Sequence, residues 1–382
     1  MKLLLSDNQL HLRFAPLTLT RPVAELRCGL FTNVERWQML VPAAQIGYET
    51  EIYLSGKFPI NNGIWINAQC IANVQFAQMI GNLHDGQALY QNGLLLAKNG
   101  LEKTRVDCNI PNLIILENRW DLYKKNDAIL RQDFQIYTTN KTSTALSSTN
   151  LLIGSKQELF IAEGAHIEGA TLNTSQGPIY IGKNVEIMEG SLVRGPFALC
   201  EGSILKMGAK IYGPTTIGPY SKVGGEVNNS VFFGNSNKAH DGFLGNSVIG
   251  EWCNLGADTN NSNLKNNYAE VRLWSYETEN FAKTGLQFCG LMMGDHSKCG
   301  INTMFNTGTV IGVSANIFGS GFPRNFIPSF SWGGAKGFTT NLTAKAFEVA
   351  TEVMSRRGLE FSAQESAILE QVFEQTSVYR KD

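Results

Sequence analysis

The sequence carries almost no net charge and has no long hydrophobic run. Its 382 residues hold 32 basic and 33 acidic side chains, a formal net charge of −1. This balance gives no sign of a nucleic-acid or membrane-surface binder. No apolar run approaches the roughly 20 residues that cross a bilayer. The first residues, Met1–Asp7, turn acidic too soon for a signal peptide and favour a buried strand. We therefore expect a cytoplasmic protein, with no nucleic-acid and no membrane partner.

Cysteines are few and show no pairing pattern. There are seven, an odd number, and none forms a CxxC pair. Three of them, Cys200, Cys253 and Cys299, lie within or beside apolar positions of the repeat described next. Reduced cysteines that serve as small packing residues are the expectation.

Hydrophobic residues return every six positions through the second half of the chain. A period of six is a multiple of two, so residues i and i+6 can both point inward from successive short strands, and three such hexads close one triangular coil. No coil buries its apolar face alone, which makes the stack cooperative. The residues in phase are Ile161, Ile167, Ile181, Ile187, Val193, Leu199, Leu205, Ile211, Ile217, Val223, Ile249, Leu255, Met293, Cys299, Phe305, Ile311 and Ile317. The pattern is typical of a parallel β-helix.

The rest of the chain divides around this repeat. Residues 1–145 show no hexads, and apolar strand-like runs alternate there with helix-compatible segments, which predicts an α/β domain. The strands expected are 3–5, 51–54, 64–66 and 112–116, and the helices 34–40, 71–80 and 123–132. The polar stretch 138–150 predicts a linker. The β-helix is expected over 151–330 and two helices within 340–382, the second opening with the capping-box pair Ser362 and Glu365. The fold class is therefore α/β plus all-β.

The hexads break twice, between Val223 and Ile249 and between Leu255 and Met293. Loops that leave a β-helix often carry binding and catalysis. The first break holds His240 beside Lys238. A neutral imidazole can act as a general base, and a lysine can neutralise a substrate phosphate. The alternative is an exposed loop histidine without a role. His296 lies at a coil turn in the second block of hexads and could line an acyl-donor cleft.

The segment Lys238–Leu264, KAHDGFLGNSVIGEWCNLGADTNNSNL, resembles the acetyltransferase site of the bifunctional N-acetylglucosamine-1-phosphate uridylyltransferase/glucosamine-1-phosphate acetyltransferase family. The resemblance implies a left-handed β-helix that uses acetyl-CoA and forms homotrimers. It implies His240 as catalytic base, Lys238, Phe243 and Asn254 at the sugar phosphate, and Asn263, Ala257 and Thr259 at the acyl donor. The family carries a tyrosine where Phe243 stands. Its sugar-phosphate arginines are missing after Ala198, where Lys206, Lys210 or Lys238 would have to substitute.

The segment Phe14–Arg27 resembles the sugar-phosphate nucleotidylyltransferase part of a divergent bacterial subgroup of the same family, as does Asn118–Phe134. Arg21 and Arg27 are candidates for phosphate contacts there, or for ion pairs on the surface or between domains. The glycine-rich G-x-G-T-R-M loop is absent before Pro16, and Asn67 is not followed by the N-G-D aspartate. Mg²⁺ is therefore expected only if this domain is active.

Three functions follow from these patterns. The first is acetyl transfer from acetyl-CoA to an amino-sugar 1-phosphate, in the synthesis of a UDP-N-acetylglucosamine-type sugar nucleotide. The second is a sugar-1-phosphate nucleotidylyltransferase, dependent on UTP or dTTP, with a structural β-helix. The third is a trimeric scaffold that binds sugar nucleotides without turnover. The missing phosphate loop argues against the second, and the His240 segment against the third.

Overall fold

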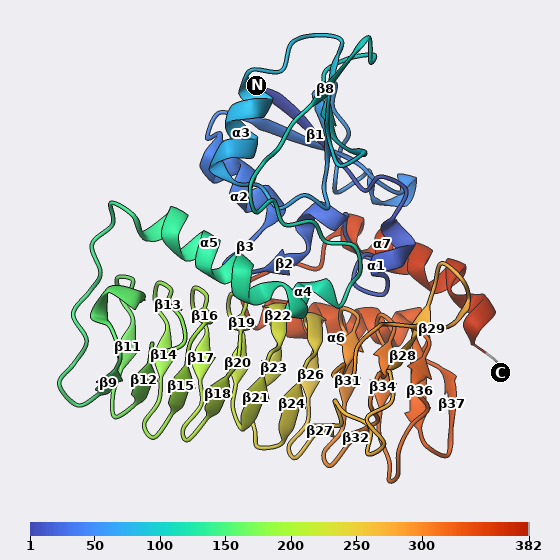
Figure 1. Cartoon of the computed structure of the whole chain (residues 1–382). Coiled ribbons are helices and arrows are strands. Elements are labelled where there is room, and N and C mark those ends of the chain that lie inside the picture. The colour runs from blue at the N-terminus through green and yellow to red at the C-terminus, as the bar shows by residue number, and fades with distance from the viewer. Residues whose placement is uncertain (381–382) are drawn as a thin grey trace.

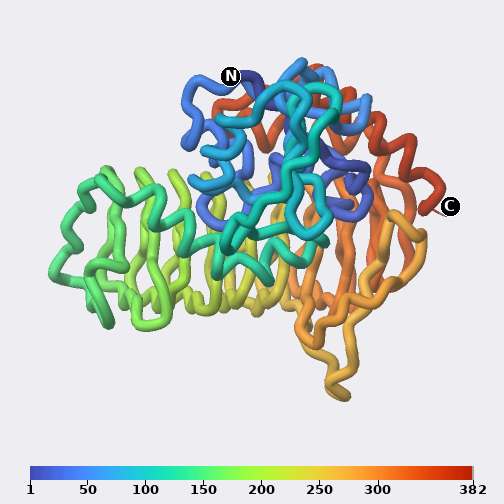
Figure 2. Tube along the Cα trace, turned by 45° about the horizontal axis from the view of Figure 1, so that its top comes forward, coloured from blue at the N-terminus to red at the C-terminus, as the bar shows by residue number. Residues whose placement is uncertain are grey.

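The computed structural model describes residues 1–380. It places a six-stranded sheet with short helices above a long parallel β-helix, along which α6 and α7 also lie (Figure 1). The first coils of the β-helix extend beyond the α/β region, which stands over the middle and later coils (Figure 2). The expected combination of α/β region, left-handed β-helix and C-terminal helices is confirmed. The division into three separate domains stays a prediction.

The N-terminal sheet has the strand order β4-β1-β5-β7-β6-β8. Its parallel part joins β1 to β4 and β5, and β7 runs antiparallel to both β5 and β6. The strands are β1 (Lys2–Ser6), β4 (Gln45–Glu49), β5 (Ile64–Asn67), β6 (Gln87–Gln91), β7 (Leu94–Lys98) and β8 (Thr104–Asp107), with a small hairpin of β2 (Arg27–Cys28) and β3 (Phe31–Thr32). The helices of this region are α1 (His11–Phe14), α2 (Asn33–Leu40), α3 (Val74–Gly81), α4 (Asp121–Lys124) and α5 (Asn126–Thr138).

Two of the expected N-terminal strands are wrong. Residues Ile52–Leu54 form a 3-10 turn, because the backbone N–H groups of Leu54 and Ser55 bond to carbonyls three residues earlier, and Ile52 points into solvent. The segment 112–116 contributes only an isolated bridge, between Ile115 and Cys70. The helix expected at 123–132 is split into α4 and α5 around Lys125.

The β-helix is built from three sheets of short parallel strands. The first is nine-stranded: β10 (Leu159–Ile161), β13 (Ile179–Ile181), β16 (Phe197–Leu199), β19 (Thr215–Ile217), β22 (Val231–Gly234), β25 (Val248–Glu251), β30 (Met292–Met293), β33 (Val310–Ile311) and β35 (Phe326–Ile327). The second is ten-stranded and ends in an antiparallel hairpin: β11 (His166–Ile167), β14 (Glu186–Ile187), β17 (Ile204–Leu205), β20 (Lys222–Val223), β23 (Asn237–Lys238), β26 (Asn254–Leu255), β31 (Lys298–Cys299), β34 (Asn316–Ile317), β36 (Ser331–Gly334) and β37 (Gly337–Thr340).

The third sheet closes the triangle. It holds β9 (Leu151–Ile153), β12 (Thr171–Asn173), β15 (Leu192–Arg194), β18 (Lys210–Tyr212), β21 (Glu226–Asn228) and β24 (Phe243–Gly245), after which β27 (Asn260–Asn261) pairs with β32 (Met304–Phe305). The hexad residues all face the interior, and none of them is more than 5% exposed. The hexad spacing therefore identified the core of this part of the chain correctly.

The two breaks differ in kind. At the first break the coils continue without an extruded loop. The corners after Val223, Val227 and Leu244 are shorter than elsewhere, so inward residues there follow one another after fewer than six positions. The side chains that face the interior in this stretch are Val227, Phe232, Lys238 and Leu244. The expectation of a loop thrown out at His240 is wrong in this respect. The second break holds a true insertion, the antiparallel hairpin β28 (Arg272–Ser275) and β29 (Asn280–Lys283).

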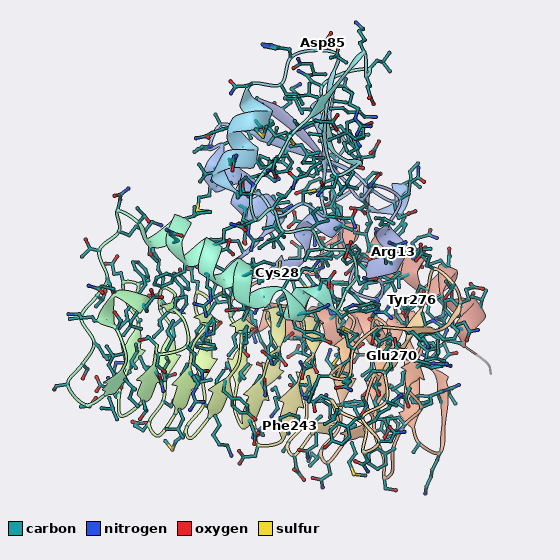
Figure 3. The ribbon with its side chains drawn as sticks, in the orientation of Figure 1. Arg13, Cys28, Asp85, Phe243, Glu270 and Tyr276 are labelled. Carbon is teal, nitrogen blue, oxygen red and sulfur yellow. The ribbon has the colours of Figure 1, made fainter. Side chains whose placement is uncertain are left out.

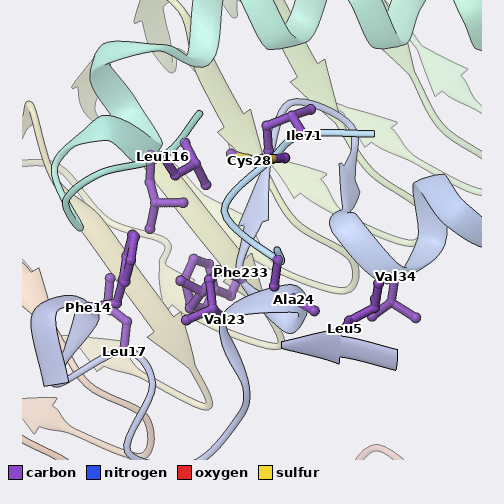
Figure 4. Close-up of a cluster of buried hydrophobic side chains, with 14 of the residues drawn as sticks. Leu5, Phe14, Leu17, Val23, Ala24, Cys28, Val34, Ile71, Leu116 and Phe233 are labelled. Atoms are coloured by element: carbon purple, nitrogen blue, oxygen red, sulfur yellow. The ribbon is translucent and has the colours of Figure 1, made fainter. Parts of the chain in front are cut away.

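The α/β region and the β-helix share one hydrophobic cluster. Figure 4 shows Phe233, on the outer face of β22, among the N-terminal side chains Phe14, Val23 and Ala24. Helices α6 (Thr343–Ser355) and α7 (Ala363–Gln375) follow the last coil, and α7 opens with the predicted capping box of Ser362 and Glu365. None of the described helices is long and apolar enough to span a bilayer.

We expect the coil stack to depend strongly on each inward aliphatic side chain. Ile211 is 1% exposed between Val193 and Val227 of the neighbouring coils. Replacing Ile211 with Ala should lower the free energy of unfolding by about 2–5 kcal/mol, because it leaves a cavity that the stack cannot close. Urea denaturation measures this loss. The adjacent Lys210 points outward on the same strand, so Lys210→Ala should change stability by less than about 0.5 kcal/mol.

Candidate active site

His240 lies at the corner between β23 and β24, with its side chain exposed. The hydrogen bonds found among residues 1–380 leave its ring without a partner. The backbone beneath the ring is held at three successive carbonyls: His240 O accepts from Lys238 Nζ at 2.8 Å, Asp241 O from Asp258 N at 3.0 Å, and Gly242 O from Glu226 N at 3.2 Å. The corner therefore offers a free imidazole on a fixed main chain.

Two neighbouring coils meet at this corner. Phe243 N donates to Asn260 Oδ1 at 2.8 Å, and Gly245 N donates to Asn261 Oδ1 at 2.9 Å. Asn261 takes an inward hexad position and is buried, so its amide replaces an aliphatic side chain inside the coil. Neither asparagine was predicted as a site residue from the sequence, where the only signal was the polar side chain at hexad position 261.

The acyl-donor candidates sit on the coil above His240. Asn263 Nδ2 donates to Asn246 Oδ1 at 2.8 Å, and Asn246 borders a hollow of about 630 Å³ beside α4 and residues 285–288. Ala257 is half-buried at the corner next to that of His240. Thr259 is buried, and its hydroxyl donates to Gly256 O at 2.7 Å, so this side chain serves the backbone. Asn254 is exposed on β26, in register with Asn237 and Lys298.

Lys238 is placed differently from the other candidates. Its side chain is 1% exposed and turns into the β-helix, where Nζ donates to Gly224 O at 3.1 Å and to His240 O. Burial lowers the pKa of this ammonium to about 8, against the opposing effect of Asp241. The ammonium of Lys238 therefore bonds to backbone carbonyls inside the β-helix, and does not face solvent where a sugar phosphate would bind.

Arg21 and Arg27 are not near His240. Arg21 pairs with Glu251 at 3.1 Å and with Asp295, both on the β-helix, and Arg27 donates to Leu30 O and pairs with Glu35 at 2.9 Å. Figure 3 shows Cys28, which follows Arg27, at the junction of the two parts, and Phe243 at the opposite edge of the β-helix. The guanidinium of Arg21 is thereby engaged in holding the two parts together.

His296 and Trp252 pack against each other, with Trp252 buried and His296 partly buried. Their rings stack with centroids 6.2 Å apart, and burial lowers the pKa of His296 to about 3. His296 is therefore a neutral ring packed against Trp252. Trp274 stacks on Phe326 with centroids 4.2 Å apart, and Tyr276 is 4% exposed. The rings of Trp252, Trp274 and Tyr276 therefore serve packing within the structure.

A second polar hollow, of about 420 Å³, lies at the carboxyl end of β1 and β4. Asp7 accepts from Val23 N at 2.8 Å and from Thr50 Oγ1 at 2.6 Å, and it pairs with His11. Glu49 accepts from Trp65 Nε1 at 2.6 Å. Both carboxylates therefore already accept hydrogen bonds from protein groups. Residues 1–380 contain no group of three or more His, Cys, Asp or Glu side chains placed to hold a metal. This donor set does not fit a Mg²⁺ ion, which requires oxygen ligands in near-octahedral geometry.

Gly242 shapes the His240 corner. Its φ is +122°, and a Cβ at this position would collide with the carbonyl oxygen of Thr259 on the next coil. Gly242→Ala should therefore displace the corner and cost about 1–3 kcal/mol of stability. Thermal unfolding followed by circular dichroism measures the cost. Gly56 has open space around it, so Gly56→Ala is the matched control.

Among the comparisons with known proteins, the match to a family model falls on the N-terminal part of the chain. Residues 3–142 match the family model described as sugar nucleotidyl transferase. A curated relative, the bifunctional protein GlmU of Methanocaldococcus jannaschii, is 34% identical over 89 residues, which are 23% of this chain and 21% of the relative. The chain thus matches about a fifth of the length of that relative.

Solved structures also resemble the chain, at low similarity. A putative acetyltransferase of Bacillus cereus has 13% identity over 61% of this chain and 99% of its own, with a TM-score of 0.25. A UDP-N-acetylglucosamine acyltransferase of Bacteroides fragilis has 15% identity over 62% of this chain and 84% of its own, with a TM-score of 0.28. Scores of this size carry no information on activity. The chain is thus similar to the sugar nucleotidyl transferases over residues 3–142 and to the bifunctional protein GlmU over 89 residues, and its second part folds as a parallel β-helix.

Proposed function

We propose that the β-helix transfers an acetyl group from acetyl-CoA to the amine of an amino-sugar 1-phosphate such as glucosamine-1-phosphate. The observation that carries the proposal is the His240 corner, an exposed imidazole on a backbone held at three successive carbonyls. A neutral imidazole that is open to solvent can accept a proton from an attacking amine, which is the task of a general base.

In this reaction the imidazole takes a proton from the acceptor amine as the nitrogen attacks the thioester carbonyl carbon. The tetrahedral intermediate expels the CoA thiolate, which receives the proton from the imidazolium. One C–N bond forms, one C–S bond breaks, and His240 returns to its neutral form. Backbone N–H groups of the glycine-containing corner would stabilise the developing oxyanion in this proposal.

The other candidates take supporting places in this proposal. Asn254 and Phe243 would contact the sugar, and Asn263 with Ala257 would lie on the acyl-donor side. Lys206 is the proposed partner of the sugar phosphate, since its stem packs on Gly224 at the same corner of the coil stack. Lys206 and His240 lie at corresponding corners of coils that are two apart. Because neighbouring strands are about 4.8 Å apart, the two corners are about 10 Å from each other. The corner is open on one chain, and we propose that a second and third copy enclose it in a homotrimer.

An acceptor panel tests this function. Purified protein would be incubated with acetyl-CoA and glucosamine-1-phosphate, glucosamine-6-phosphate or glucosamine, and the products identified by mass spectrometry. The proposal expects an N-acetylated product, formed fastest with a phosphorylated acceptor. Unchanged acetyl-CoA with all three amines, under conditions in which the protein is folded, would contradict it.

Nucleotidyl transfer is the second candidate, and the match of residues 3–142 favours it. The hollow at the end of β1 argues against it, because Asp7, Glu49 and Glu51 place negative charge where a triphosphate would lie. Lys98 is the one lysine or arginine in that lining. Release of pyrophosphate from UTP or dTTP and a sugar 1-phosphate is the corresponding assay.

A further inference from the structure

Lys238 occupies a position that the β-helix otherwise fills with aliphatic side chains. It lies in register with Val223 on the coil below, and its backbone carbonyl accepts from Gly224 N at 2.8 Å. The interior around it includes Leu244 and Leu255, both at most 2% exposed. Burying an ammonium group in such a place is costly unless hydrogen bonds compensate it. A structural or functional reason should therefore exist for a lysine here.

The compensation comes from two carbonyls at one corner. Lys238 Nζ donates to Gly224 O at 3.1 Å and to His240 O at 2.8 Å. The main-chain carbonyls of Asp241 and Gly242 accept instead from backbone N–H groups of the neighbouring coils. Of these three successive carbonyls, only that of His240 accepts its hydrogen bond from a side chain, the ammonium of Lys238.

The charged and titratable groups around the ammonium have unequal effects. Asp241 at the corner, Asp258 on the next coil and Cys299 on β31 each favour the charged form, whereas burial disfavours it more strongly and lowers the pKa to about 8. His240 itself stands two residues away, with its ring toward solvent. Bonds from a charged donor are roughly twice as strong as bonds from a neutral one, so loss of this charge weakens the hold on the His240 carbonyl.

We propose that Lys238 is a positioning residue, whose buried ammonium holds the His240 backbone in place from inside the β-helix and so sets where the imidazole stands. This proposal rests on the proposed function of His240. It differs from a substrate contact, because the ammonium points away from solvent and bonds to main-chain oxygens.

The variant Lys238→Met tests the proposal, because methionine matches the length of the lysine stem and suits an apolar interior. Hydrogen–deuterium exchange should show faster exchange in the 239–242 segment by about tenfold, as expected when a bond from a charged donor is lost. In the acetyl-transfer assay kcat should fall by about 10- to 100-fold with KM little changed, because a misplaced base slows the chemical step. Lys222→Met, which removes an exposed lysine from the neighbouring strand, is the control and should change neither readout.

The pH profile separates positioning from packing. In the wild-type protein the rate should fall as the pH rises through about 8, where Lys238 loses its charge, and Lys238→Met should lack this limb. Unchanged exchange at 239–242 in a folded Lys238→Met would overturn the proposal, whether or not acetyl transfer is found. A rise in KM alone would also overturn it, since it would indicate a substrate contact. If His240→Ala keeps full activity, the proposed function fails instead, and the exchange measurement still decides the role of Lys238 in holding the corner.

Discussion

Replacement of His240 by Ala should lower kcat for acetyl transfer by about 10²- to 10⁴-fold, the usual contribution of a positioned general base. The side chain is exposed and its ring makes no hydrogen bond within the described chain, so its removal should leave the coil stack intact. The rate of thiol release from acetyl-CoA, at saturating glucosamine-1-phosphate, measures the effect.

A matched control is available for this substitution. His166 is an exposed histidine on β11, in the sheet that also holds β23, and lies several coils away from His240. His166→Ala should leave kcat unchanged. If His240→Ala loses no more activity than His166→Ala, the imidazole of His240 is not the base.

The second large effect is expected at the buried ion pair between α2 and α5. Arg36 and Asp133 are 1% and 0% exposed, and Arg36 Nε donates to Asp133 Oδ1 at 2.8 Å. Asp133 Oδ2 also accepts from Leu30 N at 2.8 Å. Asp133→Asn leaves the guanidinium buried without its counter-charge, so the free energy of unfolding should fall by about 3–5 kcal/mol. Urea denaturation followed by tryptophan fluorescence is the measurement.

Asp127 supplies the control for Asp133 on the same helix. It pairs with Arg131 at 2.8 Å, but both side chains are nearly half exposed. An exposed pair four residues apart contributes about 0.3–0.5 kcal/mol, so Asp127→Asn should be nearly silent. Equal losses from Asp127→Asn and Asp133→Asn would show that burial does not determine the strength of these pairs.

The β-helix could be predicted from the sequence because its signal is local and repeated. Each hexad residue, from Ile161 to Ile317, meets the same requirement of facing the interior. The N-terminal strands were harder, since they follow no common period. A hairpin of β6 and β7 was missed although Asn92 and Gly93, both with positive φ, form the turn that such hairpins favour.

The candidate site was predictable only in part. His240 was identified from its segment, but the inward turn of Lys238 depends on the shortened corners after Val223 and Val227, which shift the phase of the hexads. The pairing of Arg21 with Glu251 and Asp295 joins residues more than two hundred positions apart. Such contacts follow from how the α/β region docks on the β-helix, which no local pattern encodes.

The proposed chemistry lies in the β-helix and not in the N-terminal hollow. The most direct test measures two products on one preparation of the wild-type protein, thiol from acetyl-CoA with glucosamine-1-phosphate, and pyrophosphate from UTP or dTTP with a sugar 1-phosphate. We predict thiol release that saturates with the acceptor, without pyrophosphate. Pyrophosphate release without any acceptor-dependent thiol release would contradict the account and move the activity to residues 3–142.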